Sequence, residues 1–444
     1  MVRWVVAGEV FTRTYASFAL ADGFRSDLIR AINSSEEFDV ATGLPLSKVE
    51  PEQPARQAEL SWLEFCASYV AARWDEVAAK TRESICDSLA TVTPSLVETR
   101  PGRPAARELR RAFLWAVHPA NVGSDPPKEV HDALNWLQDY SLPVRALADP
   151  QLIRSAIHQL TRTLTDTPAA GDTYRRRRRC LNAAIEYAVE TGNLDDNPLK
   201  RIKTKRVAVD DRVDPRVVVA PAQAREPLTS VSYVGSWDRA RGRRLVAFFA
   251  VMYYAGLRPA EAVALRVTDC QLPEKGWGKL TLAQTLPVTT KKWTDDGQRH
   301  DKRGLKQRDP DAVRIVPIPP VLVRIIRGHI DEFGVTQDGR LFRNERDGII
   351  GSTTYSRVWE EARQFAFTPA QVESSLAGRP YDLRHAALTT WLNAGTSPAD
   401  VARRAGNSVE VLLRRYAGCL DNQDELINRR IERVLDQEAE PEAG

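Results

Sequence analysis

The sequence predicts a mainly helical, α+β protein in which a helical domain precedes a mixed α/β domain with a small three-stranded antiparallel sheet. Apolar residues recur at helical spacing through most of 57–205. Residues 226–435 instead alternate helical patterns with three short stretches that read as strands, at 265–267, 279–282 and 313–316. The chain has 444 residues, which is too long for a single hydrophobic core.

The chain divides into five segments. Residues 1–55 combine a β-branched, aromatic stretch with an amphipathic helix, which predicts a small β-α module. Residues 57–205 form the helical domain. Between 206 and 225 the helical period disappears among Val, Asp, Pro and Arg, which predicts a linker. The mixed domain then occupies 226–435, and the acidic tail 436–444 is predicted to be disordered.

Composition argues against several classes of protein. The five cysteines form no CxxC pair and the six histidines show no HxxxH or HExxH spacing, so we expect no metal and no cofactor. No apolar run reaches the roughly 18–20 residues that a membrane helix needs. The N-terminal apolar stretch is also too short for a secretory signal. We therefore expect a cytoplasmic protein without a membrane partner.

Positive charge is clustered although the net charge is only +4. An arginine run occupies the first turns of a helix predicted from Thr173, where it opposes the helix dipole and an anionic partner would offset the cost. Such clusters release counterions on meeting a phosphate backbone. A solvated helix face and a basic linker are the alternative interpretation. The candidate DNA-binding residues are Arg175, Arg176, Arg177, Arg178, Arg179, Lys200, Lys203 and Lys205.

Two segments of the mixed domain carry the chemistry. The first reads Tyr254-Ala-Gly-Leu-Arg258-Pro-Ala-Glu261. The second begins with Tyr381-Asp-Leu-Arg384-His385 and continues with Gly406-Asn407 and with Tyr416. Asn407 follows Arg384 by 23 residues, and Tyr416 follows Asn407 by 9.

In residue type, order and spacing, these segments resemble the catalytic domain of the tyrosine recombinases, the phage-integrase family. The resemblance covers 226–435 and implies that Tyr416 is the nucleophile and that Arg258 and Arg384 bind the scissile phosphate. It also implies that Glu261 orients Arg258 or the neighbouring base, and that His385 supports the site by hydrogen bonding.

The residue types suit this chemistry. Exchanging phosphodiesters without metal or ATP needs a covalent nucleophile that conserves the bond energy. A phenol, with a pKa of about 10, must be activated by its surroundings. Two guanidiniums supply permanent forked donors for the charge that develops on the phosphate oxygens, which lysine cannot match.

By the same resemblance, a lysine on the β-hairpin protonates the leaving 5′ oxygen. Lys306, shortly before the last predicted strand, is the candidate. The polar insert between the strands lengthens this hairpin and leaves three competitors open, Lys291, Lys292 and Lys302.

Two residues depart from the family pattern. Tyr381 stands where the family usually has His or Lys, and Asn407 stands where it usually has His or Trp. Both remain candidate catalytic residues, because Tyr381 can pass or orient a proton and Asn407 can donate to a phosphate oxygen. Asn407 can also be interpreted as a simple turn residue. Both changes reduce acid–base power, within the roughly 10²–10⁴-fold that such groups contribute. A degenerate recombinase retained as a DNA-binding protein is therefore one alternative, and relaxation of DNA in the manner of a type IB topoisomerase is another.

The resemblance extends, more weakly, to the rest of the chain. Residues 57–205 resemble the family's core-binding domain, and 1–55 resemble the arm-site-binding module of some integrases. The implied partner is double-stranded DNA at attachment or recombination sites, in the nucleoid, where the enzyme integrates or excises a mobile element. Directionality or DNA-bending factors can accompany it. A tetramer would form by exchange of a C-terminal helix, unless that helix folds back on its own domain; its apolar stripe is Ile427, Ile431, Val434 and Leu435.

Overall fold

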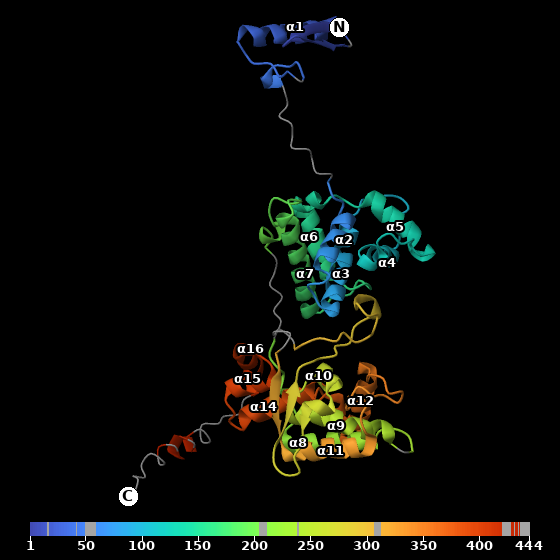
Figure 1. The fold of residues 1–444 in the computed structure, drawn as a ribbon, viewed down its shortest axis with the longest axis vertical. Coiled ribbons are helices and arrows are strands. Elements are labelled where there is room, and N and C mark those ends of the chain that lie inside the picture. The colour runs from blue at the N-terminus through green and yellow to red at the C-terminus, as the bar shows by residue number, and fades with distance from the viewer. Residues whose placement is uncertain are drawn as a thin grey trace.

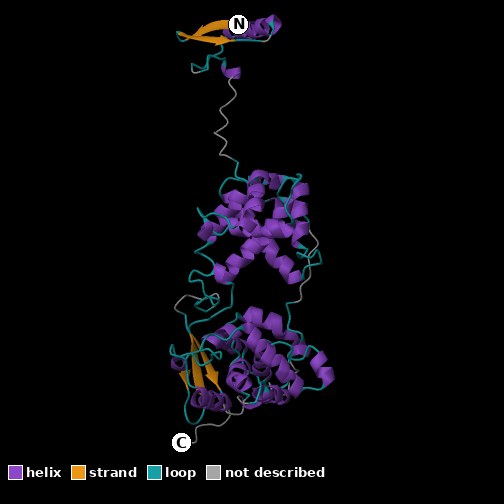
Figure 2. Cartoon of the chain, turned by 90° about the vertical axis from the view of Figure 1, so that its right-hand side faces the viewer, coloured by secondary structure: helices purple, strands orange, loops and turns teal. Residues whose placement is uncertain are grey.

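The computed structural model describes residues 1–15, 17–40, 42–48, 59–203, 211–237, 239–305, 312–419, 428–429, 431–433 and 435. It is mainly helical with two small antiparallel sheets, and this confirms the predicted fold class. Figure 2 shows the strands gathered at two places, with helices making up most of the remainder. Within the described ranges, none of the helices is both long and apolar enough to cross a membrane.

The N-terminal unit is a β-hairpin covered by one helix. Phe24 and Leu28 of the helix pack against Val2 of the hairpin, and the Trp4 ring meets the Phe24 ring edge to face, at 5.3 Å between centroids. The small apolar cluster explains why one helix and two strands suffice for this unit. Its elements are β1 (Val2–Val6), β2 (Glu9–Arg13) and α1 (Phe18–Asn33).

Residues 59–203, called here the helical domain, fold into six α-helices around one core. Helices α3 and α7 pack against each other at its centre, where Leu89 and Leu181 are fully buried. Ser61 precedes α2, the first helix of the domain, and forms a capping box with Glu64. The Ser61 hydroxyl accepts from the Glu64 amide, and the Glu64 carboxylate accepts from the Ser61 amide. The helices are α2 (Trp62–Arg73), α3 (Ala79–Val92), α4 (Ala106–Ala116), α5 (Lys128–Tyr140), α6 (Pro150–Leu160) and α7 (Gly171–Glu190).

The second large unit, called here the C-terminal domain, covers residues 211–419. Its centre is α9, whose apolar run is buried on all sides by α8, α11, α12 and α14 (Figure 1). The helices are α8 (Pro221–Ser230), α9 (Ala240–Tyr254), α10 (Pro259–Ala264), α11 (Pro320–Phe333), α12 (Ser352–Ala366), α13 (Pro369–Glu373), α14 (Asp382–Asn393), α15 (Pro398–Ala405) and α16 (Val409–Tyr416).

The sheet of the C-terminal domain has the order β3-β4-β5, with antiparallel neighbours. Its strands are β3 (Cys270–Gln271), β4 (Gly278–Leu282) and β5 (Arg314–Ile318). The first strand lies beyond the predicted 265–267, so that prediction was wrong. The Asp269 carboxylate accepts from the Arg266 amide at 2.9 Å and holds 267–269 in a 3-10 turn, which delays the strand.

The predicted linker 206–225 is also shorter than expected. Residues 204–210 lie outside the described part of the chain, but 211–225 belong to the C-terminal domain. Val213 is buried and its amide donates to the Arg415 carbonyl at 2.7 Å, while Pro221 already begins α8. Proline at the first helical position supports that start, since its missing N–H has no partner there.

The segment between β4 and β5, residues 283–313, is called here the insert. In Figure 1 its yellow trace leaves the sheet and reaches the helical domain. There Trp293, which is only 1% exposed, joins the core of the helical domain rather than that of its own. The two domains are therefore in contact through the insert, in addition to being consecutive parts of one chain.

Candidate active site

Residues from four parts of the C-terminal domain meet at one place. Arg258 and Glu261 come from the start of α10, and Arg314 comes from β5. The first turn of α14 supplies Tyr381, Arg384 and His385, and the turn between α15 and α16 leads from Asn407 to Tyr416 at the end of α16. Segments separated by more than a hundred residues thus converge, as the two predicted motifs require.

Glu261 is the buried centre of this cluster. It is 1% exposed and contacts three guanidiniums, from Arg258 at 2.8 Å, Arg314 at 2.7 Å and Arg384 at 3.9 Å. It also accepts from the Arg258 amide at 2.8 Å, so it caps α10. Burial opposes ionisation of this carboxyl, but the three arginines outweigh it and lower its pKa to about 2. Glu261 is therefore the counter-ion that allows three arginines to share a small volume.

The two predicted phosphate-binding arginines are joined through Asn407. Its Oδ1 accepts from Arg258 Nη2 at 2.9 Å and from Arg384 Nη2 at 3.4 Å. Because the two donors fix the carboxamide oxygen, the amide NH₂ points the other way and is available as a donor. The sequence also allowed Asn407 to be a simple turn residue, but its side chain contacts both arginines.

The two arginines differ in exposure. The side chain of Arg258 is 22% exposed, whereas that of Arg384 is 1% exposed. Arg384 donates to the Gly256 carbonyl and, at 2.6 Å, to the Ala405 carbonyl. Burial lowers its pKa to about 10, with a further contribution from the Arg258 charge, so it remains protonated at neutral pH. Arg258 presents the accessible guanidinium and Arg384 lies behind it.

Gly406 allows this close packing. Its φ is +66°, a left-handed conformation that ends α15, and its amide and the Asn407 amide close the helix onto Arg403 and Ala402. A side chain at this position would overlap the guanidinium of Arg314. Glycine is therefore needed at position 406 for its left-handed backbone and for the room that Arg314 occupies. Asn407 has a different role, because it joins Arg258 to Arg384.

The predicted nucleophile is buried and hydrogen-bonded. The Tyr416 hydroxyl lies 2.8 Å from His385 Nδ1, and the residue is 2% exposed. Burial raises the pKa of the phenol, although the charge of Arg384 opposes this. Burial also lowers the pKa of His385 to about 4, with the charges of Arg415 and Arg384 adding to the effect. His385 is therefore neutral at pH 7, and its Nδ1 lies within hydrogen-bonding distance of the Tyr416 hydroxyl.

Tyr381 lies between these groups. Its hydroxyl interacts electrostatically with the Arg258 guanidinium, and its ring contacts the His385 ring at 5.1 Å between centroids. Its half-buried side chain at the start of α14 therefore joins the phosphate-binding arginine to the histidine that holds Tyr416. This geometry gives Tyr381 a place in the cluster despite its departure from the family pattern.

The lysine candidates divide into two groups. Lys306 lies outside the described residues. Lys291 and Lys292 directly precede Trp293 on the part of the insert that contacts the helical domain, with Lys292 Nζ 4.8 Å from the Trp293 ring centroid. Lys302 follows Asp301, whose carboxylate accepts from the Ala79 amide of the helical domain. The three competitors therefore occupy the part of the insert that packs on the helical domain.

The arginine run on α7 is not a single solvent-facing surface. Arg177 is 8% exposed, donates to the Arg162 carbonyl at 2.8 Å and lies 3.5 Å from Asp87, so among the predicted DNA-binding arginines this one points into the helical domain. Successive helical residues point about 100° apart, which turns one member of the run into the core. Arg176 and Arg179 are exposed.

The other basic candidates differ in their surroundings. Arg175 pairs with Asp211 at 3.4 Å, and Arg178 is half-buried. Lys200 is exposed and pairs with Glu186 at 2.9 Å. Lys203 is exposed, whereas Lys205 lies outside the described residues. The accessible cations of this region are therefore fewer than the sequence predicts.

Sequence reasoning missed Arg314. It shares the inward side of β5 with Val316 and Ile318, and all three are buried. Strand alternation contains the signal, because an arginine in phase with two apolar core residues must meet a buried carboxylate. That carboxylate is Glu261.

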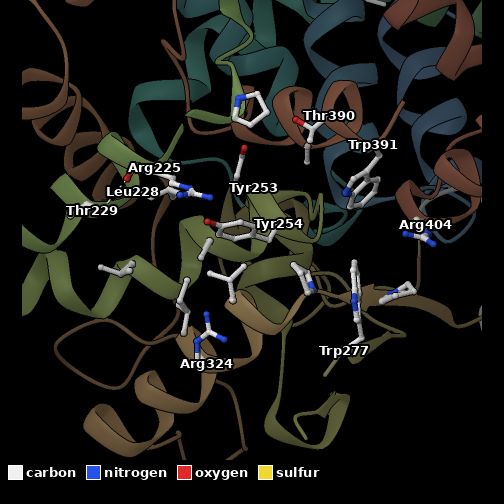
Figure 3. Close-up of a pocket in the computed structure, with 18 residues that line it drawn as sticks. Arg225, Leu228, Thr229, Tyr253, Tyr254, Trp277, Arg324, Thr390, Trp391 and Arg404 are labelled. Atoms are coloured by element: carbon white, nitrogen blue, oxygen red, sulfur yellow. Dashed lines mark hydrogen bonds between the residues drawn. The ribbon is translucent and has the colours of Figure 1, made fainter. Parts of the chain in front are cut away.

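Another hollow of the C-terminal domain lies apart from these residues. A cavity of about 750 Å³ is lined by residues of α8, α9, α11, α14 and α15. Figure 3 shows Tyr254, Trp277 and Trp391 in its wall, together with Arg225, Arg324 and Arg404. None of the predicted catalytic residues lines it. In the described ranges, no cluster of three or more His, Cys, Asp or Glu could hold a metal ion.

Comparison with known proteins identifies the fold. No family model matches the sequence. The Tn1549 transposon integrase, solved in complex with a circular intermediate DNA, aligns with a TM-score of 0.54 and 15% identity, over 84% of this chain and 99% of that chain. The same integrase in complex with transposon right end DNA gives a TM-score of 0.53 and 15% identity, over 85% and 100%. This chain has the tyrosine recombinase fold.

A sequence relative extends the comparison. The Escherichia coli (strain K12) protein named "Putative defective protein IntQ" is 23% identical over 236 residues, which are 51% of this chain and 55% of that protein. The chain therefore matches about half the length of this curated relative. The cluster around Glu261 lies in the C-terminal domain, which contains both sequence motifs, the one around Arg258 and the one from Tyr381 to Tyr416.

Proposed function

We propose that this protein is a site-specific DNA recombinase or integrase, which cleaves and rejoins double-stranded DNA through a 3′-phosphotyrosine at Tyr416. The observation that carries the proposal is the hydrogen bond between Tyr416 and a neutral His385, beside two arginines joined by Asn407. The tyrosine recombinase fold supports it, and so do the DNA complexes of the Tn1549 integrase. The proposed substrates are attachment sites in nucleoid DNA, where a mobile element is integrated or excised.

The chemistry follows from the cluster. The Tyr416 oxygen attacks the scissile phosphorus while its proton passes to His385 Nδ1. The bond from phosphorus to the 5′ oxygen breaks, and that oxygen takes a proton from Lys306, the proposed donor. Arg258 and the Asn407 amide donate to the nonbridging oxygens, on which negative charge develops. The free 5′ hydroxyl of a partner strand then reverses the reaction and releases Tyr416.

The grip on DNA uses both domains. We assign phosphate contacts to the exposed Arg176, Arg179 and Lys203 of the helical domain and to Arg258 of the C-terminal domain. DNA-bending or directionality factors are further proposed partners. Glu261 neutralises part of the positive charge of the three arginines at the site. The site alone therefore attracts DNA less strongly, and we expect binding to depend on contacts made by both domains.

A trapping experiment tests the proposal. Nicked substrates from DNA that flanks the gene should yield a covalent protein–DNA adduct with the wild-type protein and none with Tyr416→Phe, because only the phenol can form the phosphotyrosine. The measurement is denaturing gel electrophoresis with labelled DNA. The matched control is Tyr233→Phe, which removes a hydroxyl from a half-exposed tyrosine in a 3-10 turn before α9.

A DNA-binding protein that does not cleave is the second candidate. The observations in its favour are the burial of the Tyr416 hydroxyl and the substitutions at Tyr381 and Asn407. A specific gel shift without any adduct would support it and would contradict the recombinase proposal. Adducts that form on any sequence, with relaxation of supercoils, would instead indicate an activity of the type IB topoisomerase kind.

The cavity of Figure 3 is a suitable acceptor for C-terminal helix exchange in a tetramer. Its wall combines aromatic rings with Arg225, Arg324 and Arg404. The C-terminal stripe is apolar, with Ile431 and Leu435 more than half exposed, and the tail that follows is acidic. Ile427 and Val434 of the stripe lie outside the described residues. Apolar contact and charge complementarity thus match the two surfaces.

Charge reversal tests this exchange. The double variant Arg324→Glu with Arg404→Glu should bind a single DNA site normally. Complexes in which protomers on two DNA sites join should form at least roughly tenfold more weakly, because the new carboxylates repel the acidic tail of the neighbouring protomer. Native gel electrophoresis and light scattering measure the two stages. Adding Glu438→Arg and Glu440→Arg should restore assembly. Unchanged assembly by the first variant would contradict the proposed acceptor.

A further inference from the structure

The insert makes a second, specific contact between the two domains. Trp293 is buried against the ring of Trp74 at the end of α2, 6.0 Å between centroids, and against the ring of His118, at 5.3 Å. It belongs to the same core cluster as the helices of the helical domain. A tryptophan from one domain that completes the core of another is typical of a built interface rather than of a loop lying on a surface.

Polar contacts fix the insert around this tryptophan. Arg82 of α3, only 6% exposed, holds the Asp295 carboxylate with both terminal nitrogens, at 2.6 and 3.1 Å. The same guanidinium donates to the Trp293 carbonyl at 3.0 Å and to the Trp74 carbonyl at 2.8 Å. A bidentate pair of this kind adds direction as well as attraction.

Further contacts extend along the insert on both sides of Trp293. Thr290 donates to the Glu83 carboxylate at 3.2 Å, and Asp301 accepts from the Ala79 amide at 3.3 Å. The side chain of His118 bonds to the carbonyl of Lys292. Contacts spread over residues 290–301 thus hold the insert at the end of α2 and the first turns of α3.

These contacts change the topology of the molecule. The polypeptide already joins the helical domain to the C-terminal domain through residues 204–210. The docked insert adds a second connection, so the two domains and the two connections form a closed ring. In Figure 1, the insert runs from the sheet of the C-terminal domain to the helical domain.

We propose that the docked insert is a latch that closes this protein into a ring around DNA, and that it retains the protein topologically on closed-circular DNA. The proposal rests on the proposed function, in which a duplex lies between the helical and C-terminal domains. Trp293 and the Arg82–Asp295 pair are the fastening points. A duplex without ends then enters only when the latch opens, whereas a linear duplex can also thread in from an end.

Salt separates this retention from ordinary binding. Contacts between cations and phosphates weaken steeply with salt, because counterions are no longer released favourably. A ring that surrounds a circle stays linked until the ring opens or the circle is cut. The apolar Trp293 contact is not weakened by salt, so the latch holds under conditions that remove electrostatic binding.

A designed disulfide across the latch is the test. The pair Glu83→Cys with Thr290→Cys joins two side chains already in contact, in a Tyr416→Phe background that prevents covalent attachment to DNA. Oxidation after the protein has bound a plasmid should leave it on the circle in about 1 M salt, where the Debye length is about 3 Å. Cutting the plasmid should then release it. Oxidation before mixing should reduce loading on circles at least tenfold and leave loading on linear DNA unchanged.

Controls separate the latch from the proposed function. Glu83→Cys alone should behave as the unlinked protein, and Trp293→Ala should shorten retention on circles without the disulfide. Asp295→Asn, at a mostly exposed position, serves if Trp293→Ala does not fold. Low-salt gel shifts with equal release from circles and linear DNA would overturn the latch and leave the recombinase proposal intact. Loss of all DNA binding would overturn both.

Discussion

Arg258→Lys is expected to slow covalent attachment of Tyr416 to DNA by about 10²–10³-fold, the effect of removing one preorganised donor from a developing oxyanion. Lysine keeps the charge but loses the fork, so it cannot bond Glu261 and Asn407 while also donating to the phosphate. The side chain at this position is 22% exposed and keeps its positive charge in the variant, so we expect the fold to tolerate the change. Single-turnover adduct formation on a nicked substrate measures the rate.

Arg327→Lys on α11 is the matched control, since this exposed arginine contacts only the Leu272 carbonyl among the described residues. It should leave the rate within about twofold, in line with the small effects of surface changes. DNA affinity of Arg258→Lys should change far less than its rate, because the interaction forms mainly in the transition state. A parallel loss of affinity and rate would show that Arg258 acts in general DNA binding rather than on the reacting phosphate.

The sequence predicted the arrangement of the site only for residues that stand in a recognisable motif or at a position with a known local role. Arg258, Arg384 and Tyr416 stand in two motifs whose spacing implies convergence, and the structure brings them together. The position of Glu261 three residues after Arg258 is also legible, because a carboxylate at that helical position caps the preceding amide. The cap at Glu261 follows from local helix geometry, whereas the expected convergence of the two motifs rests on their resemblance to the tyrosine recombinases.

Other parts depend on partners that are distant in sequence. Arg177 and Arg314 look like ordinary cations, yet each is buried by a group that no nearby residue reveals, the Arg162 carbonyl and the Glu261 carboxylate. Trp293 sits in a polar insert that reads as a loop, and its core lies in the other domain. Burial of such residues is a property of tertiary contacts, which periodicity within one segment does not contain.

The shift of β3 shows a smaller limit of the same kind. Residues 265–267 have strand-like composition, but Asp269 caps a turn there and Arg266 instead bridges Arg340. A side chain that satisfies backbone amides locally competes with a ladder, and the local bond prevails in this case. Composition therefore located the sheet to within a few residues and left its first boundary open.

Glu261→Gln is expected to lower the free energy of unfolding of the C-terminal domain by about 3–5 kcal/mol at pH 7. The amide keeps the shape and an acceptor oxygen, but it leaves the charges of Arg258, Arg314 and Arg384 without their buried counter-ion. Urea unfolding followed by tryptophan fluorescence measures the change. Glu360→Gln on the exposed surface of α12 should alter stability by no more than about 0.5 kcal/mol.

The stabilising effect of Glu261 should depend on pH in a definite direction. The pKa of Glu261 falls from the ordinary 4.5 in the unfolded chain to about 2 in the folded protein. A lowered carboxyl pKa stabilises the fold fully above pH 4.5, and the contribution, about 3 kcal/mol, is lost as the pH falls toward 2. The difference between wild type and Glu261→Gln should therefore be constant from pH 7 to 5 and shrink below 4.5. A difference that already shrinks between pH 7 and 5 would contradict the role of Glu261 as the ionised centre of the three arginines.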